Sequence, residues 1–491
     1  MEAPGADDFL YNQIVSRLAF QIQTQVLKPG DKLPSVRALS QEQHISVSTA
    51  FKAYSELENK GLVEARPRSG FYVRGALKRP AFSRPAPSPA GTGEPPSPAV
   101  DFPQVLREVY GTLSDPHLIK LSLSAPTPNL IPVARLNKAL GHVLRESASG
   151  CAEYDDVQGN RVLRQQVARL AFNWGGTVTE KDVVTTHGCM EALVFCLKAV
   201  TRPGDLVAIE SPTYFGIFNT LHLLGLRTVV IPTDPETGIR LDALEKALGA
   251  FPIKACLFVP SFSNPCGYCM PDAHKEGLVR LLAAHNVPLI EDDTYGEMYF
   301  GKARPRTCKS FDRAGLVLYC ASVTKSLAPG YRVGWCIPGK FLEPVMQLKL
   351  TSSVSSTTPT HAAIGHFIAT SRYDLHMRHL RKTLHLQSLQ YLRAVLEAFP
   401  DDTQVAPPQG GYNLWLRLNP AINAYLLFKE ALRHRISIAP GHLFSPDGQF
   451  SHYVRISFVP PFTPQIEESI KTLGRLAHGL LAAQPASLPA F

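Results

Sequence analysis

Seven prolines lie between Pro80 and Pro98, interleaved with serine, alanine and glycine. No hydrophobic periodicity runs through this stretch, and such a composition is typical of a semi-extended linker. A chain interrupted in this way does not fold as one continuous domain. We therefore predict a small module over residues 1–75, a linker over residues 76–117 and a large domain over residues 118–491.

The composition excludes several classes of protein. The 491 residues are 45% hydrophobic and 19% charged, which excludes a mostly disordered or collagen-like chain. No uncharged apolar run approaches the roughly 18 residues of a membrane span, and acidic residues stand near the start, where a signal peptide carries basic ones. We expect a cytoplasmic protein without a membrane partner.

The nine cysteines are an odd number spread through a long chain, so we expect reduced thiols. Cys266 and Cys269 have the spacing of a redox or zinc pair. No second pair completes a set of four ligands, and we expect no metal site.

The small module has the pattern of three helices and a hairpin. A four-residue spacing predicts a first helix, which Pro29 and Gly30 end, and a second helix is expected from Pro34. The third, from Ser46 to about residue 59, turns three side chains inward and leaves Ser48, Thr49 and Lys52 outside. The spaced residues are Ile14, Leu18, Ile22 and Val26 in the first helix, and Ala50, Tyr54 and Leu57 in the third.

Residues 62–73 then predict a β-hairpin with Arg66, Arg68 and Gly70 at its tip, which is the pattern of a wing. Six basic residues and no acidic one lie between Arg66 and Arg84, an arrangement suited to a DNA backbone. Residues 1–80 carry 11 basic and 8 acidic side chains, so their total charge alone does not indicate DNA. The alternative is a three-helix module used for packing or dimerisation.

The stretches DKLPSVRALSQ and ISVSTAFKAYSELENKGLVEARPRSGFYV resemble the GntR-type winged-helix signature over its whole length. The resemblance implies an α/β winged helix-turn-helix that binds double-stranded DNA. Many members of that family carry an arginine where Val47 stands here. The residues to which the resemblance assigns DNA contacts are Ser35, Arg37, Ser48, Thr49, Arg66, Arg68 and Gly70.

The large segment alternates short apolar runs with helical stretches, which predicts an α/β architecture with a largely parallel sheet. Lys325 follows the apolar run LVLYCA, and α/β proteins place ligands at that end of a strand. Its amine can form a Schiff base with an aldehyde cofactor such as pyridoxal 5'-phosphate. Ser322 and Arg332 supply a hydroxyl and a planar cation for a phosphate. A solvated loop lysine is the alternative when Lys325 is considered alone.

A second element is the apolar run PLIEDD, which ends in acids shortly before Tyr295. A buried carboxylate keeps a pyridine nitrogen protonated, and a phenol tunes the ring hydroxyl. We assign Asp292 and Tyr295 to these roles. Glu291 and Asp293 are rivals that point elsewhere if Asp292 faces inward, and three acids solvating a loop remain an alternative.

Three further stretches complete the predicted pocket. A strand, Gly188 and a helix beginning at Cys189 and Met190 offer free backbone N–H groups to the phosphate. Tyr214 offers an aromatic face to the ring, and Asn264 an amide to the ring hydroxyl. A core tyrosine and a turn asparagine are the alternatives for these two residues when each is viewed alone.

In this order the elements resemble fold-type I aminotransferases from about Leu121 onward. The resemblance implies a mixed, mostly parallel sheet with helices on both faces and a smaller C-terminal subdomain. It implies that Arg455 binds a substrate α-carboxylate and that Tyr154 reaches the phosphate of a neighbouring subunit, hence a homodimer. Ser124 stands where the family commonly has glycine.

Both parts together resemble the MocR subfamily of GntR-type transcription regulators, which are head-to-tail homodimers. We expect a regulator that depends on pyridoxal phosphate and senses a small amine or amino acid. Two alternatives remain: an aminotransferase acting on an amino acid, since no catalytic residue is missing, and a regulator that senses pyridoxal phosphate itself.

Overall fold

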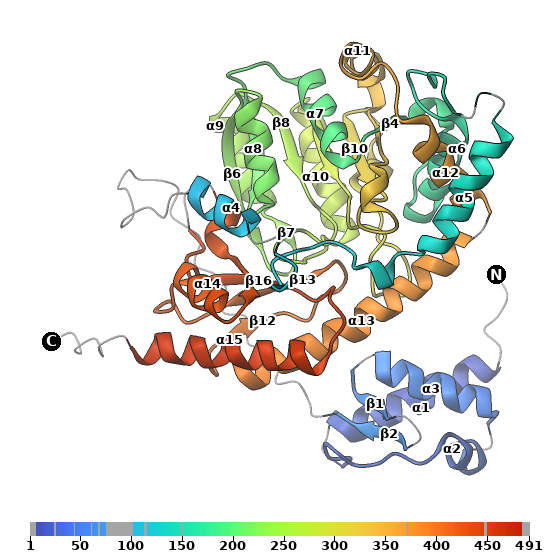
Figure 1. The fold of residues 1–491 in the computed structure, drawn as a ribbon, viewed down its shortest axis with the longest axis vertical. Helices are drawn as coiled ribbons and strands as arrows, with labels where there is room; N and C mark the ends of the chain where they lie inside the picture. Colours follow the sequence, from blue (N-terminus) through green and yellow to red (C-terminus); the bar gives the residue numbers. More distant parts are fainter. Residues whose placement is uncertain are drawn as a thin grey trace. The chain divides into compact units, whose positions relative to one another are not determined.

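The computed structural model describes residues 6–23, 26–43, 45–59, 61–66, 69–74, 102–111, 115–147, 149, 151–370, 372–445 and 449–483. The chain divides into two compact units, Met1–Ala81 and Phe82–Phe491, drawn as a ribbon in Figure 1. The proline-rich stretch from Pro80 to Pro98 lies outside the described residues. The side chains of residues 6–13, 23, 59 and 102–104 are also outside them.

The small unit consists of three helices and a hairpin, as the sequence predicted. The helices pack around one apolar core that includes Tyr54 and Phe71, whose ring centroids lie 4.8 Å apart. Backbone hydrogen bonds from Gly30 and Leu33 to the second hairpin strand add a third short extended segment beside it. The elements are α1 (Ala6–Gln23), α2 (Val36–Glu42), α3 (Val47–Asn59), β1 (Val63–Arg66) and β2 (Gly70–Val73).

Two details of the small unit differ from the expectation. Thr49 was expected on the outside of α3, but its side chain is only 7% exposed. The helical repeat places residue 49 on the same face as the buried Ala53, four positions later, and its hydroxyl lies 2.7 Å from that of Ser46. Val26 was expected to continue the apolar stripe of α1, yet it lies beyond the end of that helix and is 67% exposed.

The large unit is built on an eight-stranded sheet of order β4-β11-β10-β9-β8-β5-β6-β7. The pairs among β10, β9, β8, β5 and β6 are parallel, whereas β11 and β7 run antiparallel to their neighbours. The sheet is therefore mixed and mostly parallel, as predicted. The strands are β4 (Val184–Thr186), β5 (Leu206–Ser211), β6 (Arg227–Asp234), β7 (Gly238–Ile239), β8 (Ile253–Phe258), β9 (Leu289–Asp292), β10 (Val317–Ser322) and β11 (Gly334–Ile337).

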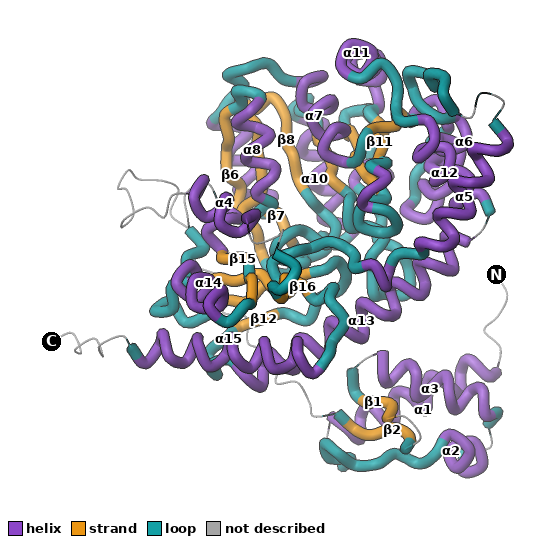
Figure 2. Tube along the Cα trace, in the orientation of Figure 1, coloured by secondary structure: helices purple, strands orange, loops and turns teal. Residues whose placement is uncertain are grey.

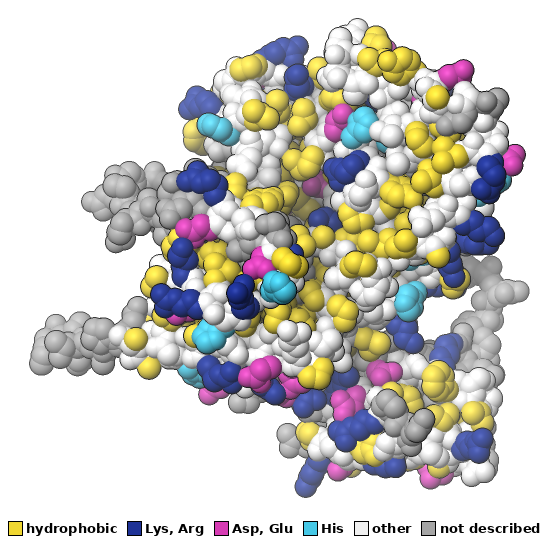
Figure 3. All heavy atoms as spheres, in the orientation of Figure 1, with side chains coloured by type: hydrophobic (Ala, Val, Ile, Leu, Met, Phe, Trp, Pro, Cys, Tyr) yellow, Lys and Arg dark blue, Asp and Glu magenta, His cyan; other side chains and the backbone are white. Residues whose placement is uncertain are grey.

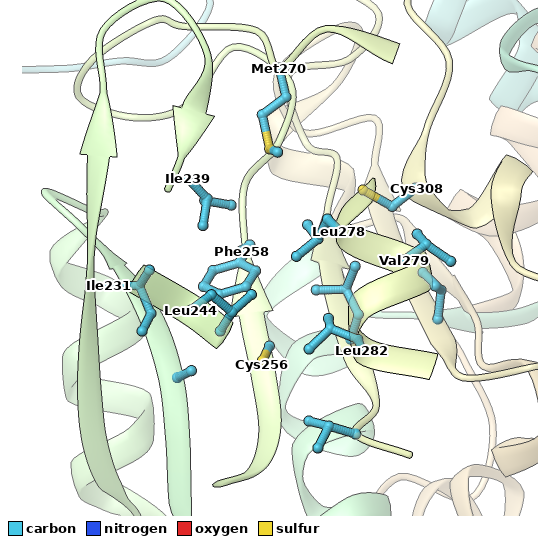
Figure 4. Close-up of a cluster of buried hydrophobic side chains, with 14 of the residues drawn as sticks. Ile231, Ile239, Leu244, Cys256, Phe258, Met270, Leu278, Val279, Leu282 and Cys308 are labelled. Carbon is cyan, nitrogen blue, oxygen red and sulfur yellow. The ribbon is translucent and has the colours of Figure 1, made fainter. Parts of the chain in front are cut away.

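Helices cover both faces of this sheet. In β10, Val317 joins the apolar cluster under α10 (Asp272–Ala284), whereas Cys320 lies 3.6 Å, sulfur to sulfur, from Cys196 of α7 (Cys189–Val200). Side chains three positions apart in a strand point to opposite faces. Figure 4 shows part of the cluster, with Leu278 and Leu282 of α10 beside Phe258 of β8.

Further helices surround the sheet, and Figure 2 distinguishes them from the loops. Helices α8 and α9 pack against β6, and α12 packs against α5 and α6. Figure 3 shows hydrophobic side chains gathered over α5, α6 and α12 on one face. The bounds are α5 (Val133–Glu146), α6 (Arg161–Ala171), α8 (Phe215–Leu223), α9 (Leu241–Ala250), α11 (Leu342–Ser352) and α12 (Thr358–Ala369).

A smaller C-terminal subdomain holds a four-stranded sheet of order β12-β13-β16-β15. The long helix α13 (Arg372–Ala398) leads into it and packs on α15 (Pro464–Ala482). Its strands and remaining helix are β12 (Gln404–Val405), β13 (Asn413–Arg417), β15 (Ala439–Pro440), β16 (Tyr453–Ser457) and α14 (Ala424–Arg433). The parallel pair β3 (Ile119–Lys120) and β14 (Ile436–Ser437) ties the start of the large unit to it.

Helix α4 (Phe102–Gly111) lies within the range that the sequence assigned to the linker. Its side chains Val105 and Val109 are buried, and the helix packs against the short 3-10 helix Gly441–Phe444. Among the described helices, none is long and apolar enough to cross a bilayer.

Candidate functional site

The sequence-predicted residues of the large unit meet where β9, β10 and β4 end. Asp292 is the last residue of β9, and its register partner in the parallel strand β10 is Cys320, two residues before Ser322. Lys325 follows in the loop after β10. Since carboxyl ends of parallel strands share one edge of the sheet, the acid and the lysine are brought to the same pocket.

Lys325 donates a hydrogen bond from Nζ to the carbonyl oxygen of Ser124, at 2.6 Å. Its Nζ also lies 5.9 Å from the centroid of the Tyr295 ring. Burial lowers the pKa of Lys325 to about 8, the charges of Arg455 and Arg332 act in the same direction, and Asp292 opposes them. A lysine of this kind offers a substantial neutral fraction near neutral pH, as imine formation requires.

Asp292 presents one oxygen to three donors. Its Oδ1 accepts from the Thr294 backbone N at 3.0 Å, the Thr294 hydroxyl at 2.6 Å and the Cys189 thiol at 3.4 Å. This set leaves Oδ2 for a further partner. Burial raises the pKa of Asp292, against the hydrogen bonds from Thr294, and a cationic partner at Oδ2 would oppose that effect.

The two rival acids point away from this pocket. Glu291 accepts hydrogen bonds from the backbone N atoms of Cys308 and Lys309, at 2.7 and 2.9 Å. Asp293 pairs with Arg304 and accepts from the Tyr319 hydroxyl at 2.8 Å. Strand alternation therefore separates the three acids as the sequence argument required, and Asp292 alone of them contacts Cys189 at the start of α7.

Arg455 of β16 is 3% exposed, and it lies close enough to Lys325 and Tyr295 for its charge to act on both. Its Nη1 donates to Oδ1 of Asn264 at 2.9 Å and its Nη2 donates to the Ser122 carbonyl oxygen. Its guanidinium carbon is 5.1 Å from the centroid of the Phe444 ring. Burial lowers the pKa of Arg455, so an anion bound there would compensate a desolvated cation.

Tyr214 and Tyr295 also line the pocket. Burial raises the pKa of each, and Arg455 acts on both in the opposite direction. Tyr295 is 5% exposed, and its hydroxyl finds no partner among the described residues. A buried, unpaired phenol is costly unless a ligand satisfies it.

The turn between β4 and α7 forms the other end of the pocket. Gly188 has φ +81° at the N-cap of α7, so Cys189 and Met190 are the first two residues of that helix, with free backbone N–H groups. A Cβ on Gly188 would lie 2.5 Å from Nη2 of Arg332. The guanidinium donates to the His187 carbonyl oxygen at 3.3 Å, and Ser322 is 7% exposed nearby at the end of β10.

These residues fit pyridoxal phosphate. The unpaired Tyr295 hydroxyl suits the ring hydroxyl, and the glycine turn with Arg332 and a helix N-terminus suits a phosphate. Asp292 keeps one oxygen for a protonated ring nitrogen. Tyr154 is the exception, because its side chain is 85% exposed on the surface of its own chain.

Sequence reasoning missed several contacts of the pocket. The Ser124 carbonyl, the Cys189 thiol, Thr294 and the Tyr412 hydroxyl, which donates to the Lys325 carbonyl, were not predicted. The described residues hold no group of three or more His, Cys, Asp or Glu side chains positioned for a metal.

The predicted DNA contacts of the small unit differ in exposure and in their partners. Arg37 and Gly70 are exposed, and so is Ser48, whose hydroxyl lies 2.7 Å from that of Ser46. Ser35 and Arg66 are exposed but engaged: the Ser35 hydroxyl caps α2 by accepting from the Ala38 backbone N at 3.1 Å, and Arg66 pairs with Glu64 at 2.8 Å. Thr49 is buried, and Arg68 lies outside the described residues.

Tyr72 was not predicted as part of this surface. The guanidinium of Arg66 lies 4.3 Å from the centroid of its ring, and Lys32 lies 5.8 Å from it on a neighbouring segment. The Ser69 hydroxyl is 2.7 Å from the Tyr72 hydroxyl. A hydrogen bond to Ser69 and the charges of Lys32 and Arg66 lower the pKa of Tyr72. Two cations, one from the hairpin and one from the segment beside it, therefore lie near this phenol.

Comparison with known proteins assigns both units to families. Residues 116–469 match the family "Aminotransferase class I and II", and residues 10–73 match "Bacterial regulatory proteins, gntR family". The uncharacterized HTH-type transcriptional regulator YjiR of Escherichia coli is 36% identical over 95% of this chain and 98% of its own length.

Aminotransferases match a smaller share of this chain, at lower identity. The 2-aminoadipate transaminase of Thermus thermophilus is 28% identical over 77% of this chain and 94% of its own. The crystal structure of LysN, the alpha-aminoadipate aminotransferase of Thermus thermophilus complexed with N-(5'-phosphopyridoxyl)-L-leucine, has a TM-score of 0.71 at 26% identity and covers 77% of this chain and 96% of that one. A family match over most of the large unit, a gntR match at the N-terminus and a full-length regulator at 36% identity show that the chain belongs to the MocR-type regulators of the GntR family.

Proposed function

We propose that this protein is a transcription regulator that binds double-stranded DNA, uses pyridoxal 5'-phosphate as its cofactor and senses a small amine or amino acid in its large unit. The observation that carries the proposal is the pocket in which Lys325, Asp292, Tyr295 and Arg455 meet, in a chain whose N-terminus matches the gntR family. When bound, the cofactor supplies an aldehyde that links to amines and a pyridine ring that withdraws electrons.

The residues have separate tasks in this proposal. Lys325 holds the cofactor through its amine, which a pKa of about 8 makes available in neutral form. Asp292 would accept a hydrogen bond at Oδ2 from the protonated ring nitrogen, and Thr294 and Cys189 orient the carboxylate through Oδ1. Tyr295 would donate to the ring hydroxyl, and Asn264 accepts a hydrogen bond from Arg455.

The phosphate would be held by backbone and side-chain donors at the β4–α7 turn. Cys189 and Met190 offer N–H groups at the start of α7, Ser322 offers a hydroxyl, and Arg332 contributes a planar cation. Tyr214 covers the ring face. Arg455 already donates from Nη1 and Nη2, and its buried Nε has no partner among the described residues. That N–H would donate to the α-carboxylate of an amino acid.

The regulatory step requires a difference in affinity. A ligand shifts the winged helices between two arrangements only if it binds one arrangement better than the other. The proposed contacts to DNA come from Arg37, Ser48 and Gly70, with Arg66 exchanging Glu64 for a phosphate. The Ser35 hydroxyl would contact DNA while it also accepts the capping hydrogen bond from the Ala38 backbone N. We propose the cytoplasm as the compartment, because a DNA-binding regulator works where DNA is.

We also propose a head-to-tail homodimer. Exposed apolar side chains lie on neighbouring elements of one face, namely Val133 and Leu144 of α5, Val162 of α6 and Phe172 directly after it. Tyr154, in the loop that precedes α6, would reach the phosphate in the partner subunit. Light scattering of the purified full-length protein measures the mass, and Tyr154→Phe should weaken cofactor binding without changing that mass.

The decisive experiment combines two measurements on the full-length protein. Fluorescence anisotropy of a labelled duplex from the DNA flanking this protein's own gene reports operator binding, with and without pyridoxal phosphate and a panel of amino acids. Absorbance of the bound cofactor reports ligand binding on the same samples. We expect salt-sensitive DNA binding whose affinity changes with the cofactor and with one class of amino acid.

Two variants separate the parts of the proposal. Lys325→Ala should abolish the visible absorbance of the bound cofactor, and an unchanged spectrum would contradict the role of that lysine. Arg455→Ala should keep the spectrum yet remove the response to amino acids. DNA binding that responds to pyridoxal phosphate but to no amine would instead identify a sensor of the cofactor itself.

A second candidate function is transamination of an amino acid. It is favoured by the complete pocket and by the similarity to the 2-aminoadipate transaminase. Turnover of an amino donor and a keto acid at metabolic rates, together with no operator binding, would favour the enzyme. A single half-reaction without turnover is compatible with the regulator.

A further inference from the structure

Helix α4 is held against the large unit at two places. On one side Val105 and Val109 are buried. On another, Glu108 binds α14 through its carboxylate, which lies 3.0 Å from both the Tyr425 hydroxyl and the Lys429 amine. Figure 1 shows α4 between α8 and α14. The helix is the first described element after the proline-rich stretch, so it joins the linker to the large unit.

Tyr110, near the end of α4, reaches the wall of the candidate pocket. Its ring meets Phe215 of α8 edge to face, with centroids 5.8 Å apart and an angle of 86°. Burial raises the pKa of the neighbouring Tyr214, and the Tyr110 hydroxyl raises it further through its charge and a side-chain hydrogen bond. Tyr110 thus packs on Phe215, whose ring centroid lies 4.5 Å from that of Tyr214, the tyrosine that we assign to the cofactor ring, and Tyr110 is 47% exposed.

The same residue lies on the Arg455 side of the pocket. Phe215, which Tyr110 contacts, is 6.0 Å from Phe444 between ring centroids, and the Arg455 guanidinium sits 5.1 Å from Phe444. Burial lowers the pKa of Arg455, while the phenols of Tyr295, Tyr214 and Tyr110 oppose that shift. An aromatic row thus connects α4 with the residue proposed to hold the carboxylate of an amino acid.

We propose that Tyr110 is a specificity-determining residue that contacts the side chain of the bound amino acid, and that this contact holds α4 against the pocket. The inference rests on the proposed function. The half-exposed phenol of Tyr110 offers a donor, an acceptor and an apolar face. Because α4 follows the linker, a ligand that fixes it also fixes the end of the tether that leads to the winged helix.

The test is a spectral titration of the cofactor-loaded, full-length protein with L-alanine, L-phenylalanine and L-glutamate. Loss of a hydroxyl contact weakens binding by about two- to tenfold, so Tyr110→Phe should lower the affinity for the amino acid that binds best. Tyr110→Ala should change the affinity ratio between L-phenylalanine and L-alanine by at least about threefold. Tyr425→Phe is the matched control, because it removes a hydroxyl that contacts α4 away from the pocket.

Hydrogen exchange of the peptide that spans residues 102–111 tests the effect on the helix. The best-binding amino acid should slow exchange in the wild type and in Tyr425→Phe, but not in Tyr110→Ala. A wild-type spectral response with unchanged affinity ratios in Tyr110→Ala would refute this inference and leave the proposed function intact. No wild-type response to any of the three amino acids would refute this inference together with the sensing of these amino acids on which it rests, but not DNA binding or the use of the cofactor.

Discussion

The lowered pKa of Lys325 predicts how fast the apoprotein takes up its cofactor at each pH. A lysine with a pKa of about 8 is about one-tenth neutral at pH 7, whereas an ordinary lysine near 10.4 is neutral in only about one molecule in 2,500. Only the neutral amine attacks an aldehyde. The rate of uptake should therefore rise about tenfold per pH unit below 8 and level off above it.

The charge of Arg455 contributes to this shift, after burial. Arg455→Gln removes a cation near the amine, so the pKa of Lys325 should rise, by up to about one unit for a charge at this range. The rate at pH 7 would then fall by about three- to tenfold. Arg433→Gln makes the same chemical change on the exposed side of α14, where Arg433 pairs with Glu430, and should leave the profile unchanged.

Stopped-flow absorbance of apoprotein mixed with pyridoxal phosphate between pH 6 and 10 measures the profile. N-α-acetyl-lysine in the same buffers corrects for the titration of the cofactor itself. A wild-type rate that climbs without levelling up to pH 10 would show an ordinary lysine and refute the reasoning from burial. A profile of Arg455→Gln that coincides with the wild type would refute the contribution of the arginine.

Three further predictions concern the turn, a second buried lysine and the DNA surface. Gly188→Ala should weaken cofactor binding at least about tenfold in equilibrium dialysis, since its Cβ would meet Arg332, whereas Gly204→Ala, with φ +93° but open space, should not. Burial lowers the pKa of Lys349 to about 8, whereas the unfolded chain keeps that proton up to about pH 10.4. The contribution of Lys349 to stability therefore rises with pH across this window, and Lys349→Met should raise the free energy of unfolding in urea by about 1–3 kcal/mol at pH 7 and by less at pH 10. Arg37→Ala should lower DNA affinity and reduce the salt dependence by about one counterion with an unchanged cofactor spectrum; equal affinity in the variant would contradict the proposed surface.

The sequence was sufficient for features that depend on local pattern. Strand alternation in the run that ends at Asp292 separates it from Glu291 and Asp293, and the structure directs those two acids to Cys308 and Arg304. Helical spacing likewise predicted that Ala50, Tyr54 and Leu57 are buried, and each is 0% exposed. Such residues are fixed by their neighbours within a few positions.

Contacts between distant segments were beyond that reasoning. The carbonyl that accepts from Lys325 belongs to Ser124, 201 positions earlier, and the thiol that contacts Asp292 belongs to Cys189, 103 positions earlier. A backbone carbonyl has no signature in the sequence, because every residue carries one. The Cys189 position was predicted for its N–H group, and only the fold shows that the thiol serves a second residue.

Helix α4 lies between these two cases. Its apolar residues Val105 and Val109 are four positions apart, which is a local helical signal, but the ten residues follow the proline-rich stretch and were assigned with it to the linker. The sequence did not predict where this helix packs: Glu108 binds α14 and Tyr110 packs against Phe215. Because α4 follows the linker in the chain and packs beside the ligand pocket, a ligand that strengthens the Tyr110 contact would favour the packed position of α4 and so fix the end of the linker.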